Sequence, residues 1–398
     1  LAVVRAAETL RAEGFTGSIV LVDADEVLPY ERPPLSKAAL KGEAGYDTAI
    51  LHDEQWYADH DIQLRRGSPV WRLDLSAHEV HVHQRDTIRY DKLLLATGSS
   101  VRTIDVPGSD AQGVYYLRTL AESQRLKERF ETKPRVVVLG AGWIGLEVAA
   151  AAREHGATVT IVEPQPTPLY GVMGPEVGQV YADLHTERGV DLRLGDGIAE
   201  VLTEDGRVSG VLTSAGHTLH ADMVVVGVGV TPNTQLAEAA GLDVEDGVVC
   251  DQSLRTSDPD VYAAGDIAAW FNPLLGYRVR VEHWANAQDG GPAAARAMLG
   301  QDAVYDVVPF FYSDQYDTGM EYAGHVRRGV QTTVVMRGDV AGREFMAFWL
   351  ADDRVLAGMH MNVWDTIDDV QALIRSGAKV DPTKLADAGV PLTEAAQG

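Results

Sequence analysis

The residues best suited to chemistry stand in a glycine-rich segment near the middle of the chain. Gly140, Gly142 and Gly145 follow an apolar run at 136–139 with the spacing G-x-G-x-x-G. In this pattern the first glycine permits a tight turn, the second lets the backbone approach a pyrophosphate, and the third allows helix and strand to pack closely. A helix that begins at the turn offers its free N–H groups and its dipole to the phosphates. The segment therefore predicts a dinucleotide site.

Glu163 follows the next expected strand and indicates which dinucleotide the turn would bind. A small, alanine-rich helical run extends to about His155, Gly156 ends it, and residues 157–162 predict a second buried strand. An acid at that strand end bonds a ribose with two free hydroxyls, and its charge repels a 2′-phosphate. The order strand, glycine turn, helix, strand, acid therefore favours NADH over NADPH.

Glu147 stands one short turn beyond Gly145, on the side of the helix that faces the same site. Burial of its carboxylate without a cation would be costly. Lys37 is the candidate cation, and it ends a rigid segment in which Pro33 and Pro34 fix the backbone. A Lys37–Glu147 pair would hold both side chains ionised. Two unrelated surface charges are the alternative.

The elements that position these residues begin with an incomplete βα unit. Residues 1–13 predict a helix and residues 18–22 a short strand. Asp23 and Asp25 follow this strand, where an acid would hold a ribose. Because the sequence opens in the middle of a βα unit, we expect that its N-terminus is clipped.

Further apolar strands run into glycine turns. Residues 92–96 predict a strand before Thr97 and Gly98, and the run 256–266 ends in Gly265 and Asp266. An unpaired carboxylate after a buried strand is unfavourable, so Asp266 is difficult to explain as a purely structural residue. A helix rich in small residues is expected over 285–299.

The last quarter of the chain has a different character. Aromatic residues appear from about Tyr305, followed by alternating strands near 330–336, 344–350 and 354–361 and a helix near 363–375. This pattern predicts a separate C-terminal α+β domain.

Composition excludes several classes of function. The chain has 398 residues and a net charge of −24, with 34 Lys and Arg against 58 Asp and Glu. This charge argues against nucleic acids and anionic membrane surfaces as partners. Cys250 is the single cysteine, which excludes a dithiol redox centre and fits a reducing cytoplasm.

Three histidines in the alternating stretch 68–90 suggest a metal site at first sight. Alternation would place His81 and His83 on one face of a strand, with His78 nearby. No cluster of carboxylates or cysteines completes a ligand set, so we expect no bound metal.

Several motifs together resemble one known family, the FAD-containing, NADH-dependent ferredoxin reductases of bacterial oxygenase and cytochrome P450 systems, of the putidaredoxin reductase and apoptosis-inducing-factor-like type. The resemblance covers essentially the whole chain and rests on eight segments. They are PYERPPLSK (29–37), LLLATG (93–98), YLRT (116–119), GAGWIGLE (140–147), GVGVTPN (227–233), TSDPDVYAAGD (256–266), VEHWANA (281–287) and FFYSDQYD (310–317).

The resemblance implies an α/β architecture of two Rossmann-like dinucleotide-binding domains, one for FAD and one for NADH, with one inserted in the other and a C-terminal α+β domain. The implied boundaries place the first part of the FAD domain at 1–108, the NADH domain at 109–231, the second part of the FAD domain at 232–304 and the C-terminal domain at 305–398.

The resemblance also implies the residues that bind each cofactor. Those toward FAD are Arg32, Lys37, Val70, Thr97, Gly98, Arg118, Asp266 and Trp284, together with the acids Asp23 and Asp25 already noted. Those toward NADH are Gly140, Gly142, Ile144, Gly145, Glu163 and Gly229. Trp284 as a simple core aromatic is the alternative for that position.

Three positions depart from the family pattern. Val3 stands where the first FAD turn has its third glycine, Thr167 stands where relatives often carry a basic residue, and 310–312 lacks tryptophan. Thr167 again disfavours NADPH.

The implied activity is transfer of hydride from NADH to FAD and of single electrons to a [2Fe–2S] ferredoxin. Lys37 and Glu147 would stabilise charge near flavin N5, and Trp143 would stack on the flavin or serve only as packing. Arg278 and Arg280 are candidates for docking an acidic ferredoxin, with a solvated strand face as the alternative. Another acceptor (a quinone or monodehydroascorbate) and a redox-sensing role are the alternative functions, and monomer and homodimer both stay open.

Overall fold

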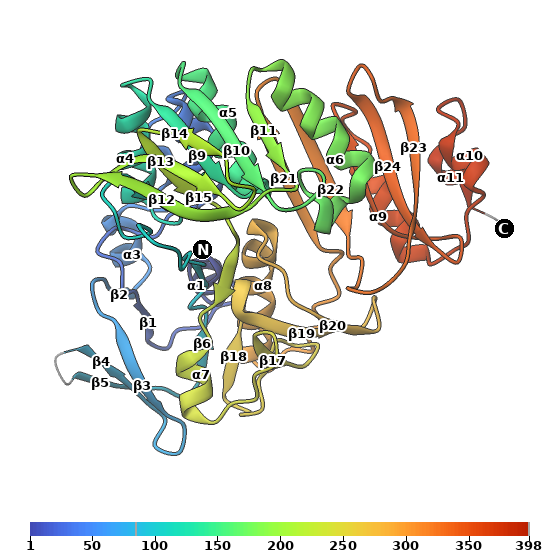
Figure 1. The fold of residues 1–398 in the computed structure, drawn as a ribbon. Coiled ribbons are helices and arrows are strands. Elements are labelled where there is room, and N and C mark those ends of the chain that lie inside the picture. The colour runs from blue at the N-terminus through green and yellow to red at the C-terminus, as the bar shows by residue number, and fades with distance from the viewer. Residues whose placement is uncertain (84–85, 397–398) are drawn as a thin grey trace. The chain divides into compact units, whose positions relative to one another are not determined.

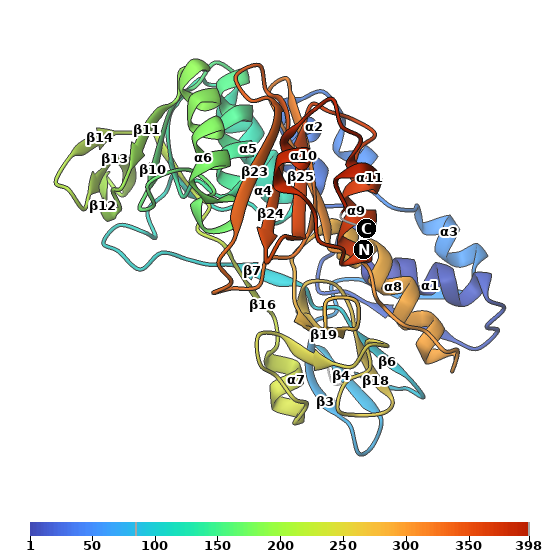
Figure 2. The ribbon, with the colours of Figure 1, turned by 90° about the vertical axis from the view of Figure 1, so that its right-hand side faces the viewer.

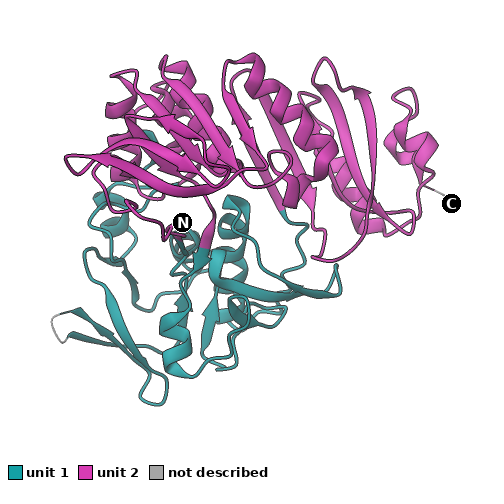
Figure 3. Ribbon diagram, in the orientation of Figure 1, with its two compact units in different colours: residues 1–31, 47–100, 231–309 teal, residues 32–46, 101–230, 310–398 magenta. Residues whose placement is uncertain are grey.

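The computed structural model describes residues 1–83 and 86–396. The chain forms two compact units, each built from three stretches, which Figure 3 colours separately. Unit 1 comprises residues 1–31, 47–100 and 231–309, and unit 2 comprises residues 32–46, 101–230 and 310–398. Among the described residues, no helix is both long enough and apolar enough to span a membrane.

Unit 1 contains parallel strand pairs, a three-stranded antiparallel sheet, a three-stranded mixed sheet and a few helices. Its helices are α1 (Ala2–Ala12), α3 (Glu54–Asp59), α7 (Gln235–Ala240) and α8 (Trp284–Met298), with the 3₁₀ turn η4 (Gly265–Ile267). Its strands are β1 (Ile19–Val22), β2 (Ile62–Arg65), β3 (Val70–Asp74), β4 (Glu79–Val82), β5 (Asp86–Arg89), β6 (Leu93–Leu95), β17 (Val248–Cys250), β18 (Val261–Ala263), β19 (Ala268–Asn272) and β20 (Tyr277–Val279). The short strands β7 (Ser99–Val101) and β16 (Val230–Pro232) lie where the chain passes between units.

The helices expected over 1–13 and 285–299 are confirmed as α1 and α8, which lie side by side in Figures 1 and 2. They pack closely because Gly291 has no side chain, and a Cβ there would lie 2.2 Å from the carbonyl oxygen of Ala2. Val3 packs against the apolar cluster that α1 forms with β1, β2 and α8. The parallel pairs β1–β2 and β6–β18 place their strand ends, and the turns that follow them, in unit 1.

Unit 2 combines a parallel sheet flanked by helices with two antiparallel sheets, one of three strands and one of five. Its helices are α2 (Ala38–Lys41), α4 (Leu120–Phe130), α5 (Trp143–Glu154), α6 (Tyr170–Glu187), α9 (Ile367–Ser376), α10 (Pro382–Ala386) and α11 (Leu392–Ala395), with the 3₁₀ turn η1 (Pro33–Leu35). Its strands are β8 (Val114–Tyr115), β9 (Arg135–Leu139), β10 (Thr158–Glu163), β11 (Asp191–Leu194), β12 (Ile198–Glu204), β13 (Arg207–Thr213), β14 (Thr218–His220), β15 (Met223–Val226), β21 (Phe310–Gln315), β22 (Thr318–Gly324), β23 (Thr333–Asp339), β24 (Glu344–Ala351) and β25 (Arg354–Met361). The 3₁₀ turn η2 (Tyr46–Ala49) spans the boundary between the units.

The parallel sheet of unit 2 has the order β11-β10-β9-β15-β8. Its central strands β9 and β15 are buried on both faces, as their continuous apolar sequences predict. Val226 lies opposite Leu139, so β9 and β15 end together, and the turns that follow them share one edge of the sheet. Ligands of open parallel sheets bind at this edge.

The expected C-terminal α+β part is confirmed as an antiparallel sheet with the order β21-β22-β25-β24-β23. Helix α9 lies against β25, where a Cβ at Gly358 would come within 2.7 Å of Val370. Strands β23, β24 and β25 match the three expected strands to within a few residues. The four-part division at 108, 231 and 304 stays a prediction, because the compact units place 101–230 and 310–398 together.

Candidate functional site

The glycine turn between β9 and α5 has the geometry of a dinucleotide site. A Cβ at Gly145 would lie 2.1 Å from the carbonyl oxygen of Gly140, so the third glycine is required for close packing. At Gly142, by contrast, no heavy atom lies within 4 Å of an added Cβ, which leaves open space beside the backbone. Gly142 caps α5 without a side-chain hydrogen bond, so the first N–H groups of the helix are left for a ligand. These features fit the pyrophosphate of NADH.

Glu163, at the end of β10, is held beside this turn by two backbone amides. Its Oε2 accepts a hydrogen bond of 2.7 Å from the N–H of Ala141, and its Oε1 accepts one of 2.9 Å from the N–H of Gln165. The carboxylate is therefore fixed where it would meet a ribose. Its negative charge at this position disfavours a 2′-phosphate.

The segment after β15 contributes to the same edge. Gly140 lies against the backbone of Gly227, which donates a hydrogen bond of 2.8 Å to the carbonyl of Leu139. Gly229 follows with a φ of +102°. Val228 in this segment and Ile144 in the first turn of α5 are exposed apolar residues, at 40% and 44%. The structure thus brings the predicted NADH residues Gly142, Ile144, Glu163 and Gly229 to one edge of the sheet.

The ion pair expected between Lys37 and Glu147 is present in unit 2. Lys37 Nζ lies 2.8 Å from Glu147 Oε1, and the Glu147 side chain is only 2% exposed. The alternative of two unrelated surface charges is therefore wrong. The catalytic role of the pair stays a prediction.

Two serines complete the surroundings of the Glu147 carboxylate. Ser36 Oγ donates to Oε2 at 2.5 Å, and Ser313 Oγ donates to Oε1 at 2.7 Å. Ser36 and Lys37 are held in turn by α4, because the buried hydroxyl of Ser123 donates a 2.6 Å hydrogen bond to the carbonyl of Leu35. With one cation and two hydroxyl donors, the carboxylate satisfies the condition for a stable buried charge.

Trp143, the first residue of α5, lies in an aromatic cluster. Its ring meets Tyr181 of α6 edge-on at 5.4 Å and Phe311 of β21 at 5.3 Å, both distances between centroids. Packing therefore accounts for part of its surroundings. Stacking on a flavin stays a prediction.

The predicted FAD residues Arg32 and Arg118 lie at the starts of elements of unit 2. Arg32 precedes η1, four residues before the serine and five before the lysine that bind Glu147. The backbone N–H of Arg118 donates to Glu122 Oε2 at 2.9 Å, just before the capping box that begins α4. Their contacts with FAD stay predictions.

In unit 1, Thr97 and Gly98 follow β6 and are held by Asn233. Asn233 Nδ2 donates to the carbonyl of Thr97 at 2.9 Å, and Thr97 Oγ1 donates to the carbonyl of Asn233 at 2.6 Å. The N–H of Asn233 also bonds the carbonyl of Gly98 at 2.9 Å. These three hydrogen bonds fix the turn at Thr97 and Gly98. The sequence did not predict this role of Asn233.

Asp266 lies in η4, directly after β18, and Trp284 begins α8. The buried side chain of Asn286 joins these two parts, because its Nδ2 donates to the carbonyls of Gly265 at 3.1 Å and Val281 at 3.3 Å. Gly265 has a φ of +73°, a conformation that residues with a side chain rarely adopt. Asn286 thereby holds η4, which contains Asp266, beside the first turn of α8. The contacts of Asp266 and Trp284 with FAD stay predictions.

The other predicted FAD residues of unit 1 lie in loops and at a strand end. Asp23 Oδ1 accepts from the N–H of Asp25 at 2.9 Å, and Asp25 Oδ1 accepts from the N–H of Val27 at 3.2 Å, so both carboxylates shape the loop after β1. Val70 begins β3, opposite Val82. Ribose and adenine contacts for these residues stay predictions.

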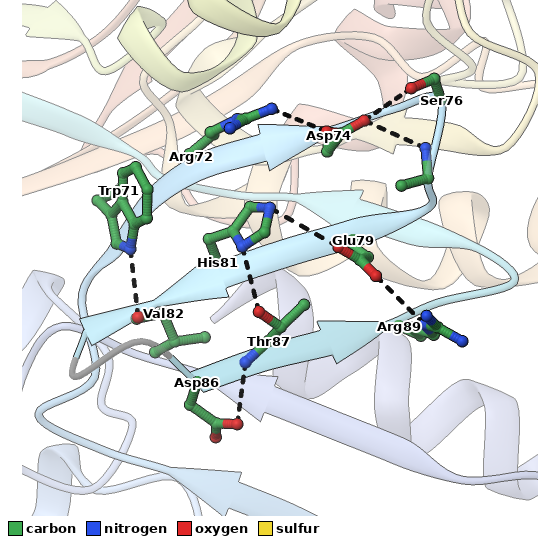
Figure 4. Close-up of polar contacts among 11 residues, drawn as sticks. Trp71, Arg72, Asp74, Ser76, Glu79, His81, Val82, Asp86, Thr87 and Arg89 are labelled. Atoms are coloured by element: carbon green, nitrogen blue, oxygen red, sulfur yellow. Dashed lines mark hydrogen bonds and ion pairs between the residues drawn. The ribbon is translucent and has the colours of Figure 1, made fainter.

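The histidine-containing meander β3-β4-β5 is drawn in Figure 4. His81 contacts Thr87 Oγ1 at 3.2 Å and lies 3.9 Å from Glu79, while His78 stacks on Tyr90. His83 follows β4, and its N–H bonds the carbonyl of Pro69 at 3.0 Å. Within residues 1–83 and 86–396, no group of three or more His, Cys, Asp and Glu residues is placed to hold a metal ion.

Comparison with known proteins identifies the family. A family model described as pyridine nucleotide-disulphide oxidoreductase matches residues 1–291, and one described as reductase C-terminal matches residues 310–396. The chain belongs to the pyridine nucleotide-disulphide oxidoreductase family. Membership confirms the expected α/β fold and the two cofactors, FAD and NAD(H). The chain has a single cysteine, Cys250, which is buried, so it contains no pair of thiols.

Relatives with assigned activities are similar to this oxidoreductase over nearly their whole length. The anthranilate 1,2-dioxygenase system ferredoxin–NAD(+) reductase component of Burkholderia cepacia is 42% identical, over 98% of this chain and 95% of the relative. Putidaredoxin reductase of Pseudomonas putida is 36% identical, over 99% and 94%. The crystal structure of the ferredoxin reductase for the CYP199A2 system of Rhodopseudomonas palustris superposes with a TM-score of 0.94 and 37% identity, covering 100% of this chain and 97% of that chain.

A solved structure of the covalent putidaredoxin reductase–putidaredoxin complex is equally similar in fold. Its matching chain gives a TM-score of 0.94 at 35% identity and covers 99% of this chain and 95% of that chain. The expected relationship to ferredoxin reductases is therefore confirmed.

Proposed function

We propose that this oxidoreductase transfers electrons from NADH, through FAD, to a [2Fe–2S] ferredoxin that serves an oxygenase or a cytochrome P450. Bound NADH supplies a hydride, and bound FAD accepts it and releases electrons singly. The observation that carries the proposal is the buried Lys37–Glu147 pair. Its glutamate lies two residues beyond the dinucleotide turn, and the chain contains no dithiol. The dioxygenase-system and putidaredoxin reductases named above support the choice of acceptor.

NADH would bind at the edge of the parallel sheet in unit 2. The open space at Gly142 admits the pyrophosphate, and the fixed carboxylate of Glu163 accepts hydrogen bonds from the adenosine ribose. Ile144, Val228 and Gly229 supply the apolar and backbone surface beside them. Because Glu163 is already oriented by two amides, it would bind a ribose without further ordering.

For FAD we propose the residues that the resemblance implies. Asp266, with Gly265 fixed by Asn286, would bond the ribityl chain, and Trp284 would lie against the flavin. Thr97 and Gly98 would lie by the pyrophosphate, Val70 by the adenine, and Asp23 and Asp25 by the ribose. Arg32, Lys37 and Arg118 would contribute the positive side chains.

Lys37 and Glu147 would stabilise charge near N5 of the flavin. The Lys37 side chain is 13% exposed and its ammonium is bound to Glu147, so it can donate a hydrogen bond without leaving a carboxylate unpaired. Trp143 would stack on one face of the flavin and move away when nicotinamide binds there. Its edge-on contacts with Tyr181 and Phe311 give it packing surfaces on which to rest.

The docking proposal for ferredoxin rests on Arg278 and its neighbour across the strands. Arg278 of β20 lies opposite Phe271 of β19, and both are exposed, on the face away from the buried Trp270. A cation beside an exposed aromatic suits an acidic partner with an apolar centre. Arg280 is different, because it is paired with Asp246 and Glu282 and donates to the carbonyl of Asp266. Its guanidinium would hold the Asp266 turn and contribute to docking only indirectly.

The test begins with the visible absorption spectrum of purified protein, which should show bound flavin. Anaerobic mixing with NADH should then bleach the flavin, and a [2Fe–2S] ferredoxin added next should be reduced. Absence of ferredoxin reduction above background, alongside rapid reduction of a quinone or of monodehydroascorbate, would overturn the assignment of the acceptor. We further propose a cytoplasmic location, supported by the single buried cysteine.

A further inference from the structure

A line of buried polar side chains leads away from Glu147 within unit 2. Ser313 Oγ contacts Glu147 Oε1 at 2.7 Å, and Gln315 Nε2 contacts Ser313 Oγ at 3.2 Å. Gln315 Oε1 lies 2.8 Å from His185 Nε2, and His185 Nδ1 lies 3.3 Å from the hydroxyl of Tyr316. Ser313, Gln315 and His185 are each 2% exposed or less, so the line is shielded from water.

The secondary structure explains why these side chains meet. Ser313 and Gln315 are two residues apart on β21, so they point to the same face of the strand, which lies against α5. His185 reaches the same face from the last turn of α6. Tyr316 occupies the hairpin turn that follows β21.

The carboxylate at one end fixes the direction of every hydrogen bond in this line. A carboxylate only accepts, so the single hydroxyl hydrogen of Ser313 points to Glu147, and Ser313 must accept from Gln315. The amide of Gln315 therefore turns its NH₂ toward Ser313 and its oxygen toward His185. His185 then donates from Nε2 and accepts at Nδ1 from the hydroxyl of Tyr316.

His185 has the protonation state that this direction requires. Burial lowers its pKa to about 4, so the ring is neutral at physiological pH and carries one N–H. A neutral ring that donates from Nε2 has a lone pair at Nδ1, which matches the contact with Tyr316. The hydrogen-bond direction that the Glu147 carboxylate imposes is thus consistent with the neutral tautomer of His185.

The backbone of Tyr316 is strained to reach this position. Its φ of +56° lies in the left-handed region, where the bulky tyrosine is uncommon and glycine or asparagine would be usual. The ring is held there by an edge-on contact with His185 at 5.3 Å and by the Arg188 guanidinium 5.1 Å above it. Strain of this kind persists only where the surrounding contacts determine the conformation.

We propose that Ser313, Gln315 and His185, with Tyr316 at the outer end, are positioning residues that orient the Glu147 carboxylate toward Lys37 and stabilise its negative charge. Every donor in the line points toward Glu147, so each hydrogen bond polarises the next in the same direction. The line does not conduct protons, because the amide of Gln315 would have to pass through an imidic acid. The effect of these residues on catalysis rests on the proposed function. The common direction of their hydrogen bonds does not.

Other ionisable groups also lie near Glu147. Lys37 approaches from the segment before α2, Asp314 lies on β21, and the phenol of Tyr181 lies on α6. Burial raises the pKa of Asp314, and the charge of Glu147 adds to this effect while Lys37 opposes it. Lys41 of α2 is paired with Glu154 at the far end of α5. Lys37 contacts the Glu147 carboxylate directly and is not part of the line that begins at Ser313.

The first experiment determines the direction of the hydrogen bonds from the tautomer of His185, and it requires no enzymatic turnover. In protein labelled with ¹⁵N-histidine, two-bond ¹H–¹⁵N spectra report the tautomer of each ring, and the His185→Gln variant assigns the His185 signal. We expect a neutral ring protonated at Nε2 whose signals stay constant from pH 8 to pH 5. A ring protonated at Nδ1, or one that titrates near pH 6.5, would overturn the proposed direction.

The second experiment measures the anaerobic reduction of bound flavin by NADH in rapid mixing. Ser313→Ala should slow reduction about tenfold with little change in NADH affinity, and Ser313→Thr, which keeps the hydroxyl, should restore it. Gln315→Leu should have a smaller effect and Tyr316→Phe the smallest, because each lies farther along the line. Gln179→Leu, which changes an exposed glutamine of α6, is the matched control and should react like wild type.

The outcomes separate this inference from the proposed function. Equal rates in Ser313→Ala, Ser313→Thr and wild type would overturn the positioning role. If wild-type flavin is not reduced by NADH at all, the proposed function fails, while the tautomer of His185 still decides the direction of the line.

Discussion

The carboxylate of Glu163 accepts a hydrogen bond of 2.7 Å from the backbone N–H of Ala141, the residue between the first two glycines of the turn. The residue expected to choose the nucleotide is thereby tied to the loop expected to hold the pyrophosphate. A change at Glu163 should therefore affect both the preference between nucleotides and the order of the turn.

Glu163→Ala should raise the KM for NADH roughly tenfold, the size expected for losing one hydrogen bond to a charged group. Glu163→Gln keeps an acceptor for Ala141 but loses the charge, so it should raise the ratio of NADPH to NADH use while losing less NADH affinity. Comparison of kcat/KM for both nucleotides checks this. An unchanged ratio in Glu163→Gln would show that the charge does not set the preference.

The sequence predicted the parts of the site that follow local rules. The turn at 140–145, the acid at Glu163 and the need of Glu147 for a cation all follow from residue type and spacing within one βα unit or from the cost of burying a charge. The pairing of Glu147 with Lys37, 110 residues away, follows from no local rule. It could be proposed because the resemblance places Lys37 near the flavin.

Residues that act through side-chain hydrogen bonds to backbone were missed. Asn233 and Asn286 hold the turns at Thr97 and Gly265, yet an isolated asparagine carries no periodic signal. Ser313 and Gln315 have the period of a strand, but the helix that meets their face is set by tertiary packing. Such contacts between distant segments cannot be obtained from local propensity.

Asn286→Ala should weaken FAD binding and lower stability together. The substitution removes hydrogen bonds to the carbonyls of Gly265 and Val281 and leaves the buried hydroxyl of Tyr305 with one partner fewer, at a cost of about 2 kcal/mol. Urea unfolding of the flavin-free protein measures the stability term, and the flavin retained after gel filtration measures binding. Retention of FAD equal to wild type would show that the Gly265 turn needs no such support.

His185 should make the protein less stable in mild acid. Burial lowers its pKa from the ordinary 6.5 to about 4, so unfolding below pH 6.5 takes up a proton that the folded state does not bind. The stability it contributes is present above pH 6.5 and is lost as the pH falls toward 4, by at most about 1.4 kcal/mol per pH unit.

Urea unfolding at pH 7, 6 and 5 tests this effect of His185. The loss of stability between pH 7 and pH 5 should be smaller in His185→Gln than in wild type. The exposed His217 provides the control, because His217→Gln should keep the wild-type pH dependence. Equal slopes for wild type and His185→Gln would contradict the assignment.

The pair of Lys37 and Glu147 can be tested for structure and function separately. Lys37→Met leaves a carboxylate that is 2% exposed without its cation, which should lower the free energy of unfolding by about 3 kcal/mol. The double variant Lys37→Met/Glu147→Leu removes both charges and should recover most of that loss, since a buried ion pair contributes little over an apolar pair. Lys41→Met breaks a pair whose carboxylate, Glu154, is 32% exposed and can be solvated by water, so its cost should stay below about 1 kcal/mol.

The same double variant decides whether the pair exists for stability or for chemistry. If Lys37 and Glu147 only fill space, the stable double variant should be reduced by NADH as fast as wild type. We expect it instead to bind flavin yet react at least tenfold more slowly in anaerobic rapid mixing, because no cation or fixed carboxylate remains beside the flavin. A wild-type rate of flavin reduction in the double variant would show that the pair takes no part in the mechanism, while its contribution to folding would still stand.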